Sequence, residues 1–537
     1  MNLLKTAATI SGLTLLSRIT GLARETLTAT YFGAGSQTDA FFVAFRLPNL
    51  LRRLFAEGAF SQAFVPVLGK VKAEQGETAA LRLARHAALL MALVLALVCV
   101  VAIIGAPLLV WLMSGGFGGQ PQTFDLAVML TRWMFPYILM ISLVALASGV
   151  LNTWSSFRVP AFAPVLLNLS FIGCAVLLSP LLDEPIWALA IAVILGGLAQ
   201  LALMAWAIMK TVREVELKEV DLKDLNDNKK KIEKEGLLEG VRAAWRDPHV
   251  RRVLTLMLPA TLAVSVAQVS LVINTHIAAR LQTGSVSWLS YADRLMEFPT
   301  ALLGVALGTV LLPSLTRANS AKNTAQVNAL IDWGLRLVAV LAIPSAVGLA
   351  VLAVPLAAAL FHYGRFDHQA LVMTAQAMTG YSLGLVGLIA IKVLAPGFYA
   401  QQNIKTPVKI ALFTLVLTQA LNLVFVPLFA HSGLAVATSL AACANAFLLY
   451  RGLRKRGVYA PSAGWGLFLG KVVLASLIMG AVIGNVAVEF EWASLAATPV
   501  IRLVWLGIIF LIAALVYFGS LRLMGLQWQQ FLKKEVT

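Results

Sequence analysis

Residues 86–113 read HAALLMALVLALVCVVAIIGAPLLVWLM, and no acidic, lysine or arginine side chain interrupts them. A helix needs about 20 mainly apolar residues to cross a bilayer, whereas a membrane β-strand needs only about 9 to 11, with alternating polarity. This stretch is too long and too evenly apolar for a barrel strand. It predicts a membrane-spanning helix.

The composition of the whole chain agrees with this stretch. Of 537 residues, 59% are hydrophobic and 12% are charged, against roughly 45–50% and 25% in soluble proteins. An ordinary soluble enzyme is therefore excluded. The first apolar stretch is not a cleavable signal peptide, because Arg18 and Arg24 stand where such a peptide needs an uncharged core.

Turn signals and charges divide the chain into further apolar stretches of this kind. The predicted fold is an all-α integral membrane protein with 14 transmembrane helices, at residues 3–32, 38–67, 86–113, 124–153, 160–182, 185–209, 253–281, 286–315, 329–361, 369–400, 407–429, 433–453, 464–486 and 499–523.

The connections between these spans differ in charge from one side of the membrane to the other. Alternate connections carry most of the lysine and arginine, whereas 114–123 and 282–285 carry no charge and 183–184 is acidic. Because basic residues collect on the cytoplasmic side, both termini are predicted to be cytoplasmic in a multi-pass protein of the bacterial inner membrane.

One long polar connection, residues 210–252, separates the sixth span from the seventh. It holds twelve basic and ten acidic residues, well mixed. Balanced, interspersed charge is more typical of a solvated amphipathic helix than of a nucleic-acid or anionic-lipid patch. We therefore expect a cytoplasmic linker, and no nucleic-acid partner.

The two halves echo each other weakly. Ser36, Arg46 and Pro66 follow the first span at spacings of 10 and 20, and Ser285, Arg294 and Pro313 follow the seventh at 9 and 19. Transporters are commonly built from such paired repeats. The expected domains are an N-lobe of helices 1–6 (1–209), the linker (210–252), a C-lobe of helices 7–12 (253–456) and two extra helices (457–537).

Charged residues within the spans gather on the first, second and eighth. Each costs about 2.5–3.5 kcal/mol at mid-bilayer and must face a partner or a wet cavity. On the second span, Asp39, Arg46 and Arg53 are seven residues apart and share one helical face, with Glu57 four residues beyond. Such polar faces predict cavity-lining helices.

Arginine outnumbers carboxylate in the first two spans, five to three. Arg18, Arg24, Arg46, Arg52 and Arg53 oppose Glu25, Asp39 and Glu57. The planar guanidinium group suits phosphate oxygens. A phosphate-bearing substrate is one interpretation, and a purely structural network of ion pairs is the other.

Metal and catalytic motifs are absent. Cys99, Cys174 and Cys443 lie far apart in apolar runs, and no HExxH, Walker lysine loop or paired-cysteine pattern occurs. We expect no metal, no cofactor and no enzymatic activity.

Distinctive motifs occur in both halves of the chain. They are Ser17-Arg18, Gly21-Leu22-Ala23-Arg24-Glu25, Phe32-Gly33, Asp39-Ala40-Phe41, Arg46-Leu47-Pro48-Asn49-Leu50-Leu51-Arg52-Arg53, Glu57-Gly58-Ala59-Phe60, Phe64-Val65-Pro66, Tyr291-Ala292-Asp293-Arg294-Leu295, Glu297-Phe298-Pro299, Leu311-Leu312-Pro313, Ala395-Pro396-Gly397-Phe398-Tyr399 and Lys405-Thr406-Pro407. Together these motifs resemble the MurJ (MviN) family of lipid II flippases, in the multidrug/oligosaccharidyl-lipid/polysaccharide exporter superfamily. The similarity covers nearly the whole chain and is weakest in 210–252.

The resemblance implies two six-helix lobes around a cavity, and a groove for a polyprenyl tail at the two extra helices. The implied substrate is lipid II, an undecaprenyl-diphosphate-linked peptidoglycan precursor, carried from the cytoplasmic to the periplasmic leaflet by alternating access. Membrane lipids and the peptidoglycan synthesis machinery are the implied partners. The implied substrate-binding residues are Arg18, Arg24, Arg52 and Arg294, with a supporting network of Ser17, Glu25, Asp39, Arg53, Glu57, Asp293 and Glu297.

Two alternatives share parts of this description: an exporter of another polyprenyl-diphosphate-linked glycan, and a membrane-embedded enzyme acting on polyprenyl phosphates. Some members of the family have a carboxylate-containing sodium site between helices seven and eleven. Here those helices offer the neutral Asn274, Thr418 and Asn422. We therefore predict that membrane potential, more than a sodium gradient, sets the direction of transport.

Overall fold

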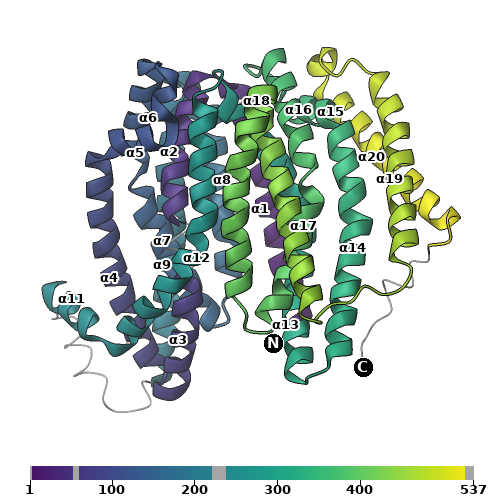
Figure 1. Cartoon of the computed structure of the whole chain (residues 1–537). Helices are drawn as coiled ribbons and strands as arrows, with labels where there is room; N and C mark the ends of the chain where they lie inside the picture. The colour runs from purple at the N-terminus through teal and green to yellow at the C-terminus, as the bar shows by residue number, and fades with distance from the viewer. Residues whose placement is uncertain (1–2, 53–59, 220–236, 527–537) are drawn as a thin grey trace. The chain divides into compact units, whose positions relative to one another are not determined.

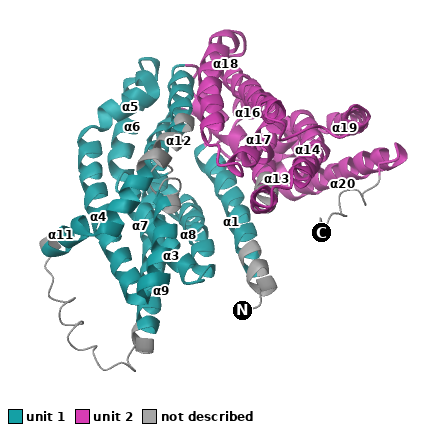
Figure 2. Cartoon of the chain, turned by 60° about the horizontal axis from the view of Figure 1, so that its bottom comes forward, with its two compact units in different colours: residues 1–32, 36–280 teal, residues 33–35, 281–537 magenta. Residues whose placement is uncertain are grey.

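The computed structural model describes residues 3–52, 60–219 and 237–526. These residues form helices and connections, and none of them lies in a β-strand (Figure 1), which confirms the all-α class. The chain divides into two compact units, shown in different colours in Figure 2. Unit 1 comprises residues 1–32 and 36–280, and unit 2 comprises residues 33–35 and 281–537.

Unit 1 contains eleven described α-helices and three short helical turns. They are α1 (Leu3–Phe32), α2 (Ser36–Arg52), α3 (Ser61–Gln75), α4 (Glu77–Ile104), α5 (Ala106–Ser114), η2 (Gly115–Gly118), α6 (Pro121–Met134), α7 (Tyr137–Thr153), α8 (Arg158–Gly173), η3 (Cys174–Leu178), η4 (Ser179–Leu181), α9 (Trp187–Glu219), α11 (Leu237–Arg246) and α12 (Pro248–Ala279).

Unit 2 contains eight described α-helices and one short turn. They are α13 (Ser285–Ser320), α14 (Thr324–Val351), α15 (Ala353–Phe361), α16 (His368–Ser382), α17 (Leu385–Tyr399), α18 (Lys405–Lys455), α19 (Trp465–Val488), η5 (Ser494–Ala497) and α20 (Pro499–Leu523).

The 51-residue α18 is two helices joined at a sharp break. Ala430 has a non-helical backbone (φ 49°, ψ −128°). A Cβ on Gly433 would lie 2.1 Å from the Phe425 carbonyl oxygen, and Asn445 donates a hydrogen bond to Thr414 across the pair. The two arms therefore fold back on each other, which confirms the turn predicted between residues 429 and 433.

Eight described helical segments are long and apolar enough to cross a membrane, or nine if the bent pair α6–α7 counts as one span. The chain is therefore a multi-pass membrane protein. The finer count of fourteen helices stays a prediction. Several predicted spans are divided between two described helices: 86–113 at Gly105, 329–361 at Leu352 and 369–400 at Leu383 and Gly384. The span 124–153 also bends by 41° where Pro136 interrupts it.

The predicted linker is partly helical. α9 continues through residues 210–219, and α11 is an amphipathic helix inside the linker, as its charge pattern indicated. α12 follows at Pro248, where the Asp247 side chain caps its first turn. The boundary between the units falls after α12, whereas the predicted C-lobe begins at residue 253. The division into functional lobes stays a prediction.

The core of unit 1 next to this region is aromatic and aliphatic. Phe60 and Phe64 stack at 4.8 Å, and both are buried among side chains of α3, α4, α7 and α12. This cluster packs the linker end of α12 against α3 and α4. It gives the polar residues at the helix ends a fixed support.

Candidate functional site

The polar end of the candidate site begins where α8 is tied to α1. The buried Asn168 side chain donates hydrogen bonds to the Ser17 carbonyl oxygen (3.0 Å) and to Thr20 Oγ1 (3.1 Å). A polar side chain buried in a membrane protein needs such partners. Ser17 therefore fastens α1 to α8 through its backbone, and its predicted role in supporting a substrate site stays a prediction.

Arg24 lies two turns further along α1. Its guanidinium pairs with Glu25 and lies 5.1 Å from the centroid of the Phe171 ring of α8. The Arg24 side chain is 13% exposed. The cation therefore has one carboxylate and one aromatic face, which holds the guanidinium in place while leaving most of its five N–H donors for other acceptors.

Phe171 also connects this arginine to α2. Its ring lies 6.3 Å from Phe41 and 5.9 Å from Phe45, and those two rings stack at 5.6 Å. Phe171 of α8 thus lies between Arg24 of α1 and the two phenylalanine rings of α2. This aromatic seat has no sequence signal, because it depends on three separate helices.

The charged face of α2 divides into three environments. Asp39 is buried in the first turn, where the helix dipole favours a carboxylate. Arg46 donates a 2.7 Å hydrogen bond to Thr275 of α12, so it ties two helices together. Arg52 lies in the last turn, half-buried, and its Nε donates to Asn49 Oδ1 at 3.2 Å.

Arg18 differs from these residues. It is half-buried on α1, and it makes no hydrogen bond or ion pair with any residue in the described ranges. Arg53 and Glu57, which were predicted to extend the polar face of α2, lie outside the described residues.

The predicted residues of unit 2 lie on α13. Arg294 Nη1 and Glu297 Oε2 form an ion pair at 2.9 Å, each side chain 45% exposed, and Asp293 beside them is half-buried. The preceding turn is firmly held: Tyr291 is fully buried and donates to the Gly33 carbonyl oxygen at 3.1 Å. Gly33 has φ 69°, and a Cβ there would meet the Arg365 carbonyl oxygen at 2.5 Å, so only glycine fits.

The structure thus brings Arg24, Glu25 and Phe171 together in unit 1, and Arg294 with Glu297 in unit 2. Arg18 lies on α1 and Arg52 lies at the end of α2. Three of the four predicted substrate arginines belong to unit 1 and one to unit 2. Their convergence on one cavity stays a prediction.

An acidic centre that the sequence analysis did not single out lies on α14. Asp332 accepts hydrogen bonds from Tyr459 (2.8 Å), Trp465 (2.6 Å) and the Ser462 hydroxyl (2.7 Å). Its other strong partner is Arg336, at 2.9 Å. The Arg336 guanidinium in turn lies 5.1 Å from the ring of Trp465. These contacts anchor the connection between α18 and α19.

A second set of anchoring contacts joins the start of α20 to the end of α15. Arg502, near the start of α20, is fully buried and donates to four carbonyl oxygens: those of Ala358, His362, Trp492 and Ala493. Burial, followed by the positive charge of Arg502, lowers the pKa of His362, which lies in the connection after α15. This arginine serves the fold, because its charge is matched by carbonyls at a helix C-terminus.

Both anchors carried a signal of the kind used for α1 and α2. Asp332 and Arg336 are charged residues four apart within a predicted span. The same rule that marked Arg18 and Arg24 would have marked them. The rule could not predict the partners of Asp332, because Tyr459 and Ser462 lie in the connection 456–464 and reach Asp332 only in the folded chain.

Two of the three residues named for a possible ion site donate hydrogen bonds within α18. Thr418 donates to the Thr414 carbonyl oxygen and Asn422 to Gln419. Within the described ranges, no three side chains of His, Cys, Asp or Glu lie together as metal ligands would.

Comparison with protein families places this chain clearly. The family model described as "Lipid II flippase MurJ" matches residues 28–501. The lipid II flippase MurJ of Burkholderia cenocepacia is 51% identical over 534 residues, covering 99% of this chain and 100% of that protein. The probable lipid II flippase MurJ of Haemophilus influenzae is 39% identical, covering 97% of this chain and 100% of that one.

Solved structures agree with the sequence comparison. The inward closed conformation of a lipid II flippase MurJ matches with a TM-score of 0.74 at 25% identity, covering 98% of this chain and 99% of that one. An inward-facing multidrug resistance MATE family transporter of the MOP superfamily matches with a TM-score of 0.64 at 12% identity, covering 84% and 98%, which shows a shared fold. The chain therefore belongs to the MurJ family of lipid II flippases, which are transporters and not enzymes.

Proposed function

We propose that this protein moves lipid II from the cytoplasmic to the periplasmic leaflet of the inner membrane, where the headgroup enters peptidoglycan. The observation that carries the proposal is the 51% identity with a MurJ flippase along almost the whole chain. The substrate is an amphiphile with a diphosphate, a sugar-peptide headgroup and a long polyprenyl tail. Each part needs its own kind of surface.

The diphosphate site of the proposal consists of Arg18, Arg24, Arg52 and Arg294. A diphosphate needs several guanidinium donors, because each of its oxygens accepts charge-assisted hydrogen bonds. Arg24 supports this assignment, since its guanidinium is held on Phe171 and pairs with one carboxylate, that of Glu25, among the described residues. Arg18 supports it as well, because it has no bonded partner among the described residues.

The supporting residues of the proposal hold these arginines. Glu25 orients Arg24, Glu297 orients Arg294 and the Ser17 backbone fastens α1 to α8. Asp39 and Asp293, with Arg53 and Glu57, complete the network. In the transport cycle, the two six-helix lobes of a fourteen-helix protein expose this network to each side in turn.

The tail site of the proposal lies at residues 457–537. Leu474 of α19 and Leu503 and Leu511 of α20 are exposed apolar side chains, and an apolar surface in the bilayer suits a polyprenyl chain. The anchors at Asp332 and Arg502 fix both ends of these helices to α14 and α15. A groove there would therefore move together with unit 2.

The driving force of the proposal is the membrane potential. Moving an anion outward is favoured by about 2.3 kcal/mol per elementary charge per 100 mV when the cytoplasm is negative. The potential also draws the empty, cationic cavity back toward the cytoplasm. Both termini and the linker 210–252 lie on that side in the proposed orientation, within reach of the peptidoglycan synthesis machinery.

Reconstitution in vesicles tests the proposed function. Purified protein is placed in liposomes with fluorescent lipid II, and the fraction accessible from outside is measured with a potential or a sodium gradient imposed separately. We expect movement with lipid II that responds to potential. No movement of lipid II, together with movement of another polyprenyl-diphosphate-linked glycan, would establish the alternative exporter; dependence on sodium alone would refute the driving force.

A further inference from the structure

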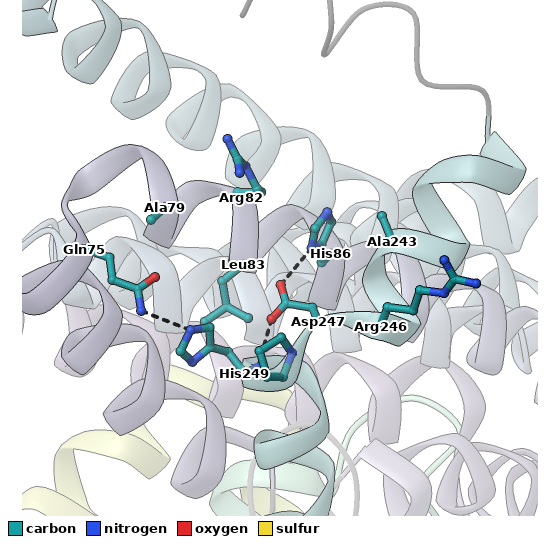
Figure 3. A pocket seen from close by; sticks show the side chains of 10 residues that line it. Gln75, Ala79, Arg82, Leu83, His86, Ala243, Arg246, Asp247 and His249 are labelled. Atoms are coloured by element: carbon teal, nitrogen blue, oxygen red, sulfur yellow. Dashed lines mark hydrogen bonds and ion pairs between the residues drawn. The ribbon is translucent and has the colours of Figure 1, made fainter.

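Unit 1 contains a second basic site, far along the chain from the arginines of α1 and α2. A cavity of about 380 Å³ lies between α3 and α4 on one side and α11 and the start of α12 on the other. Its size falls in the ~300–1,000 Å³ range of small-molecule sites. Figure 3 shows the side chains that line it.

The single acidic residue of this cavity is already occupied. One carboxylate oxygen of Asp247 lies 2.9 Å from His86 Nδ1, and the other accepts the backbone N–H of His249 at 2.9 Å. The dashed lines of Figure 3 mark both contacts, and a third joins Gln75 to the His249 ring at 3.2 Å. His86 is 8% exposed, so the floor of the cavity is a fixed polar framework.

Two arginines line the same cavity without a partner there. Arg82 of α4 and Arg246 of α11 are both exposed, and neither pairs with Asp247 or with any other described residue. They come from helices that are separated by more than a hundred residues, and the Asp247–His86 contact holds those helices together. Among the described residues, the cavity therefore presents two exposed guanidinium groups beside two imidazole rings, and its one carboxylate is already bonded.

The surface beside the cavity has the pattern of a membrane interface. Trp245, next to Arg246, is 58% exposed, whereas Ala244 and Gly240 on the other side of α11 are buried against α4. An amphipathic helix with an exposed tryptophan and arginines is typical of the headgroup layer. At that depth, the abundant anion is the phosphate of a lipid headgroup.

We propose that the cavity between α4 and α11 binds a phosphate group, supplied by an anionic membrane lipid, through Arg82 and Arg246. It lies apart from the proposed substrate arginines, and it fastens the linker helix α11 to α4 when occupied. Free phosphate has the same chemistry, and the experiment distinguishes the two sources. The test measures equilibrium binding, so it does not depend on the transport function proposed above.

The test uses the full-length protein in detergent, with native mass spectrometry as the readout. The probes are phosphatidylglycerol, phosphatidylcholine and inorganic phosphate, each added separately. The test variant is the double substitution Arg82→Gln with Arg246→Gln. The control is Arg242→Gln with Arg252→Gln, which removes the same charge from exposed positions of α11 and α12 outside the cavity lining.

We expect the test variant to bind phosphatidylglycerol at least about tenfold more weakly than the parent, as the loss of two charge-assisted contacts predicts. The control variant should stay within about twofold. Stabilisation by inorganic phosphate that the test variant loses, with equal binding of both lipids, would assign the site to free phosphate. Unchanged binding by the test variant, or equal losses in both variants, overturns the proposal.

Discussion

The arginines of α1 and Arg502 of α20 are charged residues in membrane helices, but their surroundings differ. Arg502 is fully buried and donates to four backbone carbonyls. Arg24 has one carboxylate and one aromatic ring, and Arg18 has no bonded partner among the described residues. The difference teaches that full burial and bonding to several backbone carbonyls mark an arginine as part of the fold, although Arg502 Nε has no hydrogen-bond partner among the described residues. A partly exposed arginine with few protein acceptors is instead a candidate for ligand binding.

Replacing Arg502 should produce the largest effect. Arg502→Gln leaves several buried carbonyls without a donor, each costing about 1–3 kcal/mol, so the free energy of unfolding should fall by more than about 3 kcal/mol. Thermal unfolding of the purified protein in detergent measures this. Arg522→Gln, an exposed position at the other end of α20, is the matched control. Equal stability of the two variants would show that Arg502 does not hold the fold together.

Replacing Arg24 should affect transport instead. Arg24→Gln keeps a polar side chain but shortens it and removes the cation, and we expect lipid II movement in vesicles to fall about a hundredfold, which is about 2.7 kcal/mol. The free energy of unfolding should fall by less than in Arg502→Gln, because Glu25, the carboxylate left behind, keeps a further interaction, whereas Arg502→Gln leaves several buried carbonyls unpaired. If Arg24→Gln loses stability and keeps transport, Arg24 serves the fold and not the substrate.

The Asp332 centre should behave like Arg502, with a smaller effect. Asp332→Asn turns an acceptor of several donors into a group with one acceptor oxygen, and its NH₂ faces other donors. We expect a loss of about 2 kcal/mol in unfolding free energy. Asp183→Asn, an exposed carboxylate in unit 1, serves as control. Wild-type stability of Asp332→Asn would contradict the role of the α18–α19 connection as an anchor.

A substitution at Arg52 that preserves charge tests whether the shape of the guanidinium group matters. Arg52→Lys keeps the positive charge at the end of α2 and loses the planar fork, so transport should fall about tenfold, or about 1.4 kcal/mol, with stability within about 0.5 kcal/mol. The control Arg213→Lys changes an exposed residue of α9. Full transport by Arg52→Lys would show that charge alone matters there.

The smallest effect concerns pH at the Arg502 anchor. Because the pKa of His362 is lowered in the folded protein, the unfolded chain binds the proton more readily. The contribution is present above pH ~6.5 and is lost as pH falls through the folded pKa. Unfolding measured from pH 7.5 to 5 should therefore show a steeper loss of stability in the parent protein than in His362→Gln. If stability falls equally with pH in the parent protein and in His362→Gln, His362 does not contribute to the pH dependence.

The local features of the charged helices could be predicted from the sequence. The surplus of arginine on α1 and α2 is a matter of composition, and the break near Ala430 follows from a short turn between two long apolar runs. The seat of Arg24 could not be predicted, because Phe171, Phe41 and Phe45 are ordinary apolar residues in their own helices. Arg46 counted toward the surplus of arginine but was not among the implied substrate arginines, and its hydrogen bond to Thr275 ties α2 to α12.

By itself, the sequence determined the membrane-spanning all-α class, because lipid leaves a backbone no partner except its own helix. It also determined which helices carry charge and, through its motifs, the family. Only the tertiary structure decided which charges are matched. Asp332 and Arg502 are bonded to connections and carbonyls brought from distant positions, whereas Arg18 has no bonded partner in the part of the chain that the structure describes. Because charges interact strongly in a medium of low dielectric, we expect the partners around each charge to distinguish an anchor from a binding site.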